Sequence, residues 1–416
     1  MLNFKLDLEQ IDKIGNFSKE EKNFRHENLK NFNNIGFPSK KYEDWKFLDL
    51  KEMIAKNFTK LDLKIRENKK ESIELIKDFD HNSIVLVNGK LFENDFRFED
   101  SKQIKLEPFY NNTFSENNEI NSLVYLNRAL SNNGFYLKVN DNYKFKKILV
   151  IYNLFTEDLS ENILNSRNEI IIGENAELHT LDYVVNKSKK NFFNNVYEKL
   201  TLNKQSVYKN IIIQNGRSKG YFYKYSKNDL SSKSSYTSYF FPTGLRFNKS
   251  DLEINLNGEN IECNLQAASF LHEGDNQEIK TRLNHFAPYC KSYQKVKNVL
   301  NTNSKGVYQG KIFVKDVAQK TDAYQLSKAL LLDDNSEFSS KPELEIYADD
   351  VKCSHGSTSG NVEDDSIYYL MTRGLSKKES VKILVSGFLS EIIDSIQSNS
   401  LKNFIKTKLE NQIYEH

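Results

Sequence analysis

Short apolar runs separated by small polar turns dominate the sequence from about residue 136 to about residue 346. The turns carry Gly, Asn, Asp and Ser, which tolerate left-handed backbone conformations. Because no strongly periodic helical segment interrupts the runs, alternating β-α-β units are excluded. The pattern therefore predicts a mainly β core and leaves a sandwich, a barrel or a β-solenoid open. The clearest runs are 168–178, 196–213, 250–265, 306–314 and 342–348.

Helical patterns precede this core. Ser18 and Glu21 form a capping-box pattern at the start of one helix. Residues 41–50 hold the only tryptophan, Trp45, which we interpret as an anchor that packs the helical part on the rest of the protein. Two apolar runs within 83–92 flank an Asn-Gly pair, and this pattern predicts a β-hairpin.

Helical periodicity returns after Gly360. Ser376 and Glu379 form a second capping box, and apolar residues follow it at helical spacing. One interpretation is that the C-terminal helices cap the end of a solenoid and bury its final rung. The other is that they form a docking surface for a partner, and the two are compatible. The apolar positions are Val381, Leu384, Val385, Phe388 and Ile392.

Charge and cysteine content limit the functional classes. The 416 residues include 59 Lys and Arg against 57 Asp and Glu, so the net charge of +2 predicts no general attraction to nucleic acid or membranes. Cys263, Cys290 and Cys353 are scattered, which excludes a disulfide framework and favours a reducing compartment. No apolar signal core opens the sequence, and no run approaches about 18 apolar residues. We therefore expect a soluble, cytoplasmic protein.

Several common catalytic motifs are missing. The sequence has no phosphate-binding loop, no dinucleotide-binding glycine pattern, no H-E-x-x-H and no G-x-S-x-G. It therefore does not look like an NTPase, a dehydrogenase, a metalloprotease or an α/β-hydrolase.

Cys353 and His355 form the strongest candidate for metal chemistry. Along a strand, positions two apart point to the same side, so both side chains can face one centre. Thiolate and imidazole are ligands of iron and iron–sulfur centres. Since a cluster normally takes about four protein ligands, the others must be folded in from afar, come from another chain, or be absent because binding is transient. The alternative is that Cys353 is a small buried hydrophobe.

Other polar pairs have structural explanations. His272 and His285, with Asp275 nearby, are interpreted as hydrogen-bonded structural groups rather than as ligands. Asp349 and Asp350 are adjacent and would point to opposite faces of a strand, so a turn or a strand end is favoured over an acid–base pair.

Long motifs stand in the C-terminal part of the sequence: P-E-L-E-I-Y-A-D-D-V-K-C-S-H-G-S-T-S-G (342–360) is followed by I-Y-Y-L-M-T-R-G (367–374). These motifs resemble the SufB/SufD family of the bacterial SUF iron–sulfur cluster assembly system, most closely its SufD branch. The resemblance is nearly end to end. Further matching stretches are 41–50, 126–130, 167–178, 285–292 and 310–325.

The resemblance implies a right-handed parallel β-helix core flanked by α-helical regions. On this sequence it divides the chain into a mostly helical N-terminal region (1–135), the parallel β-helix core (136–360) and a C-terminal helical region (361–416). It also implies a non-catalytic scaffold subunit that forms a complex with SufB and two copies of the ATPase SufC, in which ATP hydrolysis belongs to SufC.

The same resemblance implies roles for particular residues. Cys353 and His355 would lie at the junction with SufB and share a transient iron–sulfur cluster with that partner, with no cofactor tightly bound in the isolated chain. No nucleic acid or membrane partner is implied, and a homodimer in isolation stays open. The C-terminal helices would dock SufC, and the residues assigned to this docking are Tyr368, Arg373, Gly374, Leu384 and Phe388.

Two other functions remain as alternatives. The first is a homodimeric metal-binding β-helix protein that uses Cys353 and His355 without SufB. The second is a carbohydrate-active β-helix enzyme that uses Asp349 and Asp350.

Overall fold

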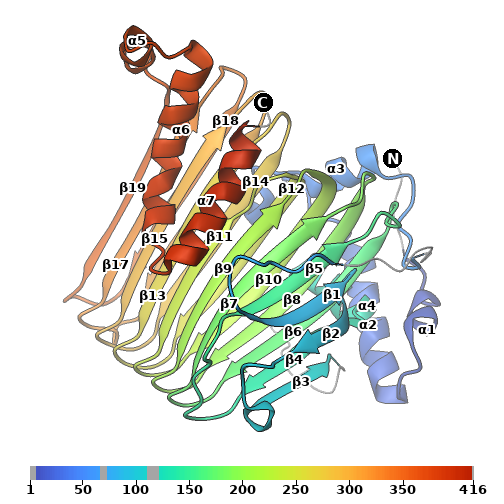
Figure 1. Ribbon diagram of the computed structural model, residues 1–416. Helices are drawn as coiled ribbons and strands as arrows, with labels where there is room; N and C mark the ends of the chain where they lie inside the picture. Colours follow the sequence, from blue (N-terminus) through green and yellow to red (C-terminus); the bar gives the residue numbers. More distant parts are fainter. Residues whose placement is uncertain (1–5, 66–72, 110–120, 415–416) are drawn as a thin grey trace.

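The computed structural model of the protein describes residues 6–65, 73–109 and 121–414. Its centre is a parallel β-helix in which the chain winds in successive coils, and each coil gives one strand to each of two long faces (Figure 1). The prediction of a parallel β-helix core between helical terminal regions is confirmed.

Strands pair in parallel with the strand two ahead in chain order, which produces two sheets. The first sheet contains β4 (Asn133–Val139), β6 (Ile163–Ile172), β8 (Phe192–Leu202), β10 (Ser218–Leu230), β12 (Leu245–Leu256), β14 (Asn276–His285), β16 (Lys305–Val314) and β18 (Glu337–Ile346). The second sheet contains β1 (Asn82–Val87), β5 (Leu149–Phe155), β7 (Glu177–Asn186), β9 (Val207–Asn215), β11 (Ser235–Phe241), β13 (Glu262–Leu271), β15 (Lys291–Leu300), β17 (Asp322–Leu331) and β19 (Lys352–Asn361).

Antiparallel pairs close the N-terminal end of the β-helix. β2 (Lys90–Asp95) pairs with β1, so the predicted hairpin is confirmed, and β3 (Ile104–Pro108) pairs with β4. Within the described residues the first strand begins at Asn82, while the proposed domain boundaries at residues 135 and 360 stay predictions.

Helices lie at both ends of the chain. Ser18 and Ser376 both cap helices as predicted, and Ser376 forms the complete capping box with Glu379. Within the described residues, no helix is both long enough and apolar enough to cross a membrane. The helices are α1 (Gln10–Ile14), α2 (Lys19–Ile35), α3 (Leu50–Asn57), α4 (Ser122–Leu130), α5 (Asp364–Thr372), α6 (Lys377–Asp394) and α7 (Asn399–Tyr414), with short 3-10 helices η1 (Glu43–Trp45) and η2 (Ser101–Gln103).

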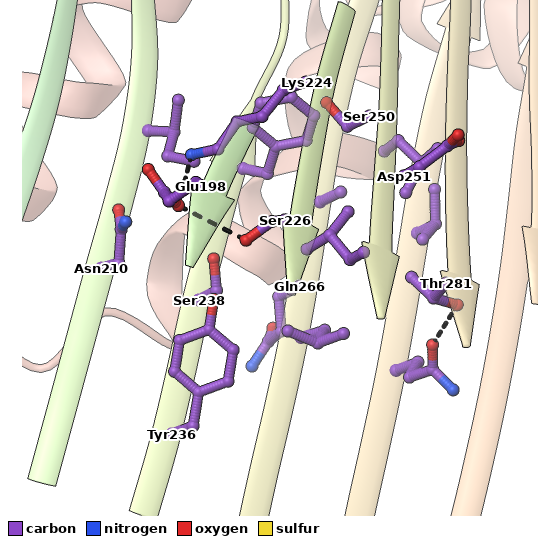
Figure 2. A pocket seen from close by; sticks show the side chains of 18 residues that line it. Glu198, Asn210, Lys224, Ser226, Tyr236, Ser238, Ser250, Asp251, Gln266 and Thr281 are labelled. Atoms are coloured by element: carbon purple, nitrogen blue, oxygen red, sulfur yellow. Dashed lines mark hydrogen bonds and ion pairs between the residues drawn. The ribbon is translucent and has the colours of Figure 1, made fainter. Parts of the chain in front are cut away.

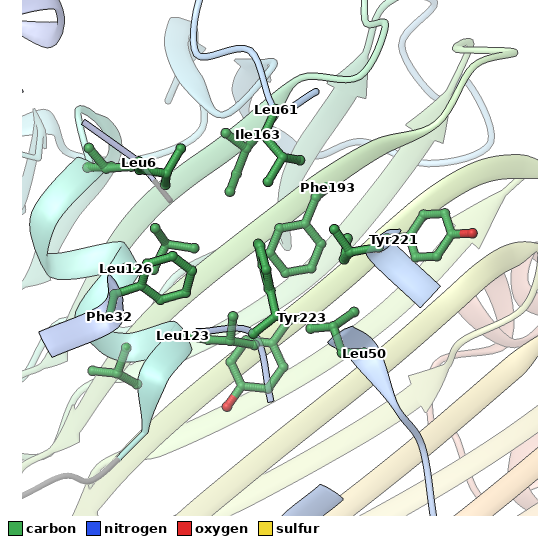
Figure 3. Packing of buried hydrophobic residues seen from close by; sticks show 14 of the residues in the cluster. Leu6, Phe32, Leu50, Leu61, Leu123, Leu126, Ile163, Phe193, Tyr221 and Tyr223 are labelled. Atoms are coloured by element: carbon green, nitrogen blue, oxygen red, sulfur yellow. The ribbon is translucent and has the colours of Figure 1, made fainter. Parts of the chain in front are cut away.

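The N-terminal helices cover the outer face of the first sheet. Phe32 of α2 and Leu126 of α4 pack in one buried cluster with Phe193 and Tyr221, which project outward from β8 and β10 (Figure 3). Because the helices cover this outer face at β8 and β10, large apolar residues occupy outward positions there, and the strict polar alternation of a half-exposed sheet is lost.

Trp45 fixes the N-terminal segment to this face. Its side chain is almost fully buried, and its ring stacks on Phe247 at a centroid distance of 6.4 Å and lies 5.6 Å from Tyr223. Lys249 Nζ lies 4.7 Å from the centre of the indole ring and donates a hydrogen bond to the carbonyl of Asp44. The anchor interpretation of Trp45 is confirmed.

The C-terminal helices cover the outer face of the second sheet. Leu389 of α6 and Phe404 of α7 are buried in a cluster with Ile213 and Phe241 of the strands. The interpretation that these helices bury the final rung is therefore wrong, because α6 contacts β13 and β15 while the last coil stays open (Figure 1). The outer face of the second sheet is apolar at these positions, and covering it removes apolar surface from water.

Trp45→Ala should detach the N-terminal segment. Losing a buried indole is expected to lower the free energy of unfolding by about 3 to 5 kcal/mol, measured by urea denaturation. Tyr42→Ala is the matched control, because Tyr42 lies in the same segment and is 45% exposed. Equal losses in the two variants would contradict the anchoring role.

Candidate functional site at the open end of the β-helix

The last coil of the β-helix is open on its outer side. β18 pairs only with β16, and β19 pairs only with β17, among the residues that the structure describes. Each strand therefore carries backbone N–H and C=O groups along an edge with no neighbouring strand, which is the usual template for pairing with another chain.

Cys353 and His355 both lie on β19 and face the interior of this last coil. His355 stacks on Gln325 of β17, which stacks on Gln294 of β15, and both glutamines are fully buried inside the β-helix. Cys353 stacks in the same way on the buried Ala323. The register of β19 thus brings the two side chains to one face at the open end.

The two side chains differ in their surroundings. Cys353 is half-buried and packs against a small apolar cluster that includes Ile312, Val314 and Leu344. Burial raises the pKa of the Cys353 thiol, so this group is protonated near neutral pH. His355 is exposed at the end of the interior.

Polar side chains continue around the inner face of the last coil. Ser327 Oγ lies 2.8 Å from Ser340 Oγ of β18 and donates to Ser357 Oγ of β19 over 3.0 Å. Residues 6–65, 73–109 and 121–414 contain no group of three or more His, Cys, Asp or Glu side chains that could hold a metal ion. Cys353 and His355 are therefore two donors without a third of these types beside them.

The remaining polar residues that the sequence singled out have structural positions. His285 is buried, its Nε2 lies 2.9 Å from Ser292 Oγ, and burial lowers its pKa to about 4, so the ring is neutral. His272 is buried against the ring of Phe270. Asp275 accepts a hydrogen bond from the His272 backbone N–H, and burial raises its pKa to about 7.

Asp349 and Asp350 lie on the exposed turn between β18 and β19. Asp350 forms an ion pair with Lys320 of the coil beneath it, and its carbonyl accepts a hydrogen bond from the backbone of Lys320. The turn that the sequence favoured for this pair is present, and Asp350 serves the stacking of two coils.

The residues assigned to partner docking fall into two groups. Tyr368 is 69% exposed on α5, and Arg373 and Gly374 follow on the exposed turn after this helix. Leu384 is partly covered, and Phe388 packs against the second sheet, where its ring and its carbonyl both contact Lys297. α5 extends beyond the strands at the end of α6 (Figure 1).

A charged cluster inside the β-helix was missed by the sequence analysis. Glu198 of β8 and Lys224 of β10 project into the interior and form an ion pair of 2.7 Å (Figure 2). The available signal was a lysine within the aromatic run Y-F-Y-K-Y (221–225). Because both faces of β10 are covered, this run does not reveal which residues point inward.

Comparison with known proteins agrees with this architecture. Residues 155–388 match the family described as SUF system FeS cluster assembly, SufBD core domain. The iron–sulfur cluster assembly protein SufD of Escherichia coli is 23% identical over 391 residues, which cover 90% of this chain and 89% of that protein. A SufBD family protein of Synechocystis is 23% identical over 403 residues, covering 89% and 86%. SufD of Bacillus subtilis is 26% identical over 137 residues, covering 33% and 31%.

The family match extends over more than half of the chain, from the end of β5 into α6. The sequence motifs, the β-helix and this match agree, and the chain belongs to the SufBD family of iron–sulfur cluster assembly proteins and is SufD-like.

Proposed function

We propose that this protein is a non-catalytic scaffold subunit that pairs with SufB through the open end of its β-helix and docks the ATPase SufC through its C-terminal helices. The observation that carries the proposal is the position of Cys353 and His355 on the inner face of an edge strand. In this arrangement the nascent iron–sulfur cluster is the cargo of the assembly, and a second chain supplies the remaining ligands.

The two free strand edges support pairing with another β-helix. A partner strand that adds to β18 or β19 would satisfy the edge N–H and C=O groups and continue the sheet. The half-covered apolar surface around Cys353, including Leu344, would be buried by the same contact. Pairing there would also place the partner's side chains opposite His355.

The chemistry of the two donors fits transient binding. The Cys353 thiol is protonated in the free subunit because burial raises its pKa. Binding iron therefore has to release a proton, which weakens the affinity of this chain alone and makes it increase with pH. His355 is already exposed and needs no rearrangement of the β-helix to reach a ligand.

Docking on α5 would be mechanically linked to the β-helix. Glu391 of α6 forms ion pairs with Lys295 and Lys297 of β15, and these hydrogen bonds lower its pKa to about 2. A partner that moves α5 would move α6 with it, and these contacts transmit the movement to the second sheet. ATP-driven dimerisation of SufC would then change the arrangement of the two scaffolds, provided that SufC binds one arrangement better than the other.

His355→Ala should leave the complex assembled and reduce cluster formation. The imidazole is exposed and stands on the last coil, so the fold should be largely unaffected, while the yield of cluster in a reconstituted SUF complex should fall roughly tenfold or more. Ser359→Ala is the matched control, because Ser359 is exposed on the same strand. Unchanged cluster yield from an intact His355→Ala complex would refute the role of His355.

Tyr368→Ser combined with Arg373→Ala should weaken SufC binding by roughly 30-fold, measured by calorimetry, since exposed aromatic and arginine side chains are typical binding hot spots. Substitution is preferable to truncation, because removing α6 and α7 would uncover the second sheet. Phe92→Ser is the control, since Phe92 is 65% exposed on the distant β2. SufC affinity that stays the same in the double variant would rule out docking on α5.

A further inference from the structure

The interior of the β-helix is hollow in its middle coils. Two cavities of about 40 and 90 Å³ adjoin there and share the lining residues Glu198, Ile212, Lys224, Phe240 and Ser250. A cavity of about 10 to 15 Å³ holds one water molecule, so this space holds several. Figure 2 shows side chains from neighbouring strands converging on it.

The cavity borders the charged side chain of Lys224. The residue stacks between Val196 of β8 and Ser250 of β12, at an inward-facing position of β10. Its side chain is nevertheless 24% exposed, and that exposed part faces the cavity it lines. Nζ lies 2.7 Å from Glu198 Oε1, and Ser226 Oγ donates to the same oxygen over 3.4 Å.

The charges around the cavity do not balance. Glu198 is paired with Lys224, and Asp251, which also lines the cavity, is paired with Lys249, which it shares with Glu278. Asp182 of β7, by contrast, has no ion pair within the described part of the chain and accepts only a hydrogen bond of 3.4 Å from Asn210 Nδ2. Burial raises the pKa of Asp182 to about 6, so the group is ionised in mildly alkaline solution. The buried charge of Asp182 then has no ion-pair partner among the described residues, which is unfavourable unless a cation compensates it.

Asn210 supplies a second, independent sign of a ligand. The residue is 3% exposed and lines the cavity. Its Nδ2 group is used by Asp182 and by Tyr208 OH, whereas its Oδ1 atom has no hydrogen-bond donor among the described residues. A buried amide oxygen without a donor costs free energy comparable to a lost hydrogen bond.

The donor set indicates the class of ligand. Carboxylate, amide and hydroxyl oxygens are ligands of hard cations, and the described residues that line the two cavities include no thiol or imidazole. A single positive charge restores neutrality, while a divalent ion would add repulsion from Lys224. We propose that the cavity binds a partly dehydrated monovalent cation, K⁺ or Na⁺, between Asp182, Glu198 and Asn210, with water completing its coordination.

Thermal unfolding of the whole chain in different salts tests this site. At about pH 8, replacing about 100 mM choline chloride by KCl or NaCl should raise Tm by at least about 1 °C, because the cation binds only the folded protein. Choline controls for ionic strength and is too large to enter. Crystals grown with rubidium or thallium(I) should show an anomalous peak beside Asn210 Oδ1.

Two variants separate cation binding from a general effect on stability. Asp182→Asn removes the unbalanced charge and should abolish the difference between the salts. Glu278→Gln is the matched control, because Glu278 is a buried carboxylate paired with Lys249 outside the cavity; it should lower Tm in all salts and keep the cation shift. Equal Tm values in the three salts, a shift that survives Asp182→Asn, or no anomalous peak would each overturn the site.

Discussion

The hydrogen bonds that join each coil to the next are the constraint on which the rest of the structure depends. Besides the parallel strand pairs, a residue with positive φ stands at the same corner of successive coils and donates its backbone N–H to a carbonyl of the following coil. This contact fixes the spacing of the coils and therefore which side chains stack. The corner residues are Asn142, Asn175, Gln205, Lys233, Asn260, Tyr289 and Lys320.

A stack of coils leaves unpaired strand edges at its last coil. The corner contact of Lys320 to Asp350 is the last in the series, and β18 and β19 have no further coil to pair with among the residues that the structure describes. The C-terminal helices lie instead on the outer face of the second sheet, where they bury apolar side chains such as Ile213 and Phe241. The open end is therefore a consequence of how the hydrophobic surface is distributed, and it presents Cys353 and His355.

The same stacking explains the polar interior. Inward-facing positions lie directly above one another, so polar residues form ladders such as Gln294, Gln325 and His355. In the middle coils the inward-facing residues include Asp182, Glu198 and Lys224, which belong to different ladders and line one cavity. At the end of the β-helix the ladder of Gln294, Gln325 and His355 reaches the surface. The strand register thus determines both which polar residues line the interior and which residues are presented at the open end.

The sequence by itself determined the β-rich core, the helical ends, the hairpin, the anchor Trp45 and the Cys353–His355 pair, because these depend on local alternation, capping and motif residues. It did not determine where α6 and α7 pack, the repeated corners or the interior charges. The corner residues differ in residue type, so no local sequence pattern marks them. Both faces of most strands are covered, so the alternation of apolar and polar residues does not show which side chains point inward. Only the register between coils, set by backbone hydrogen bonds across about 30 residues of chain, decided which side chains point inward.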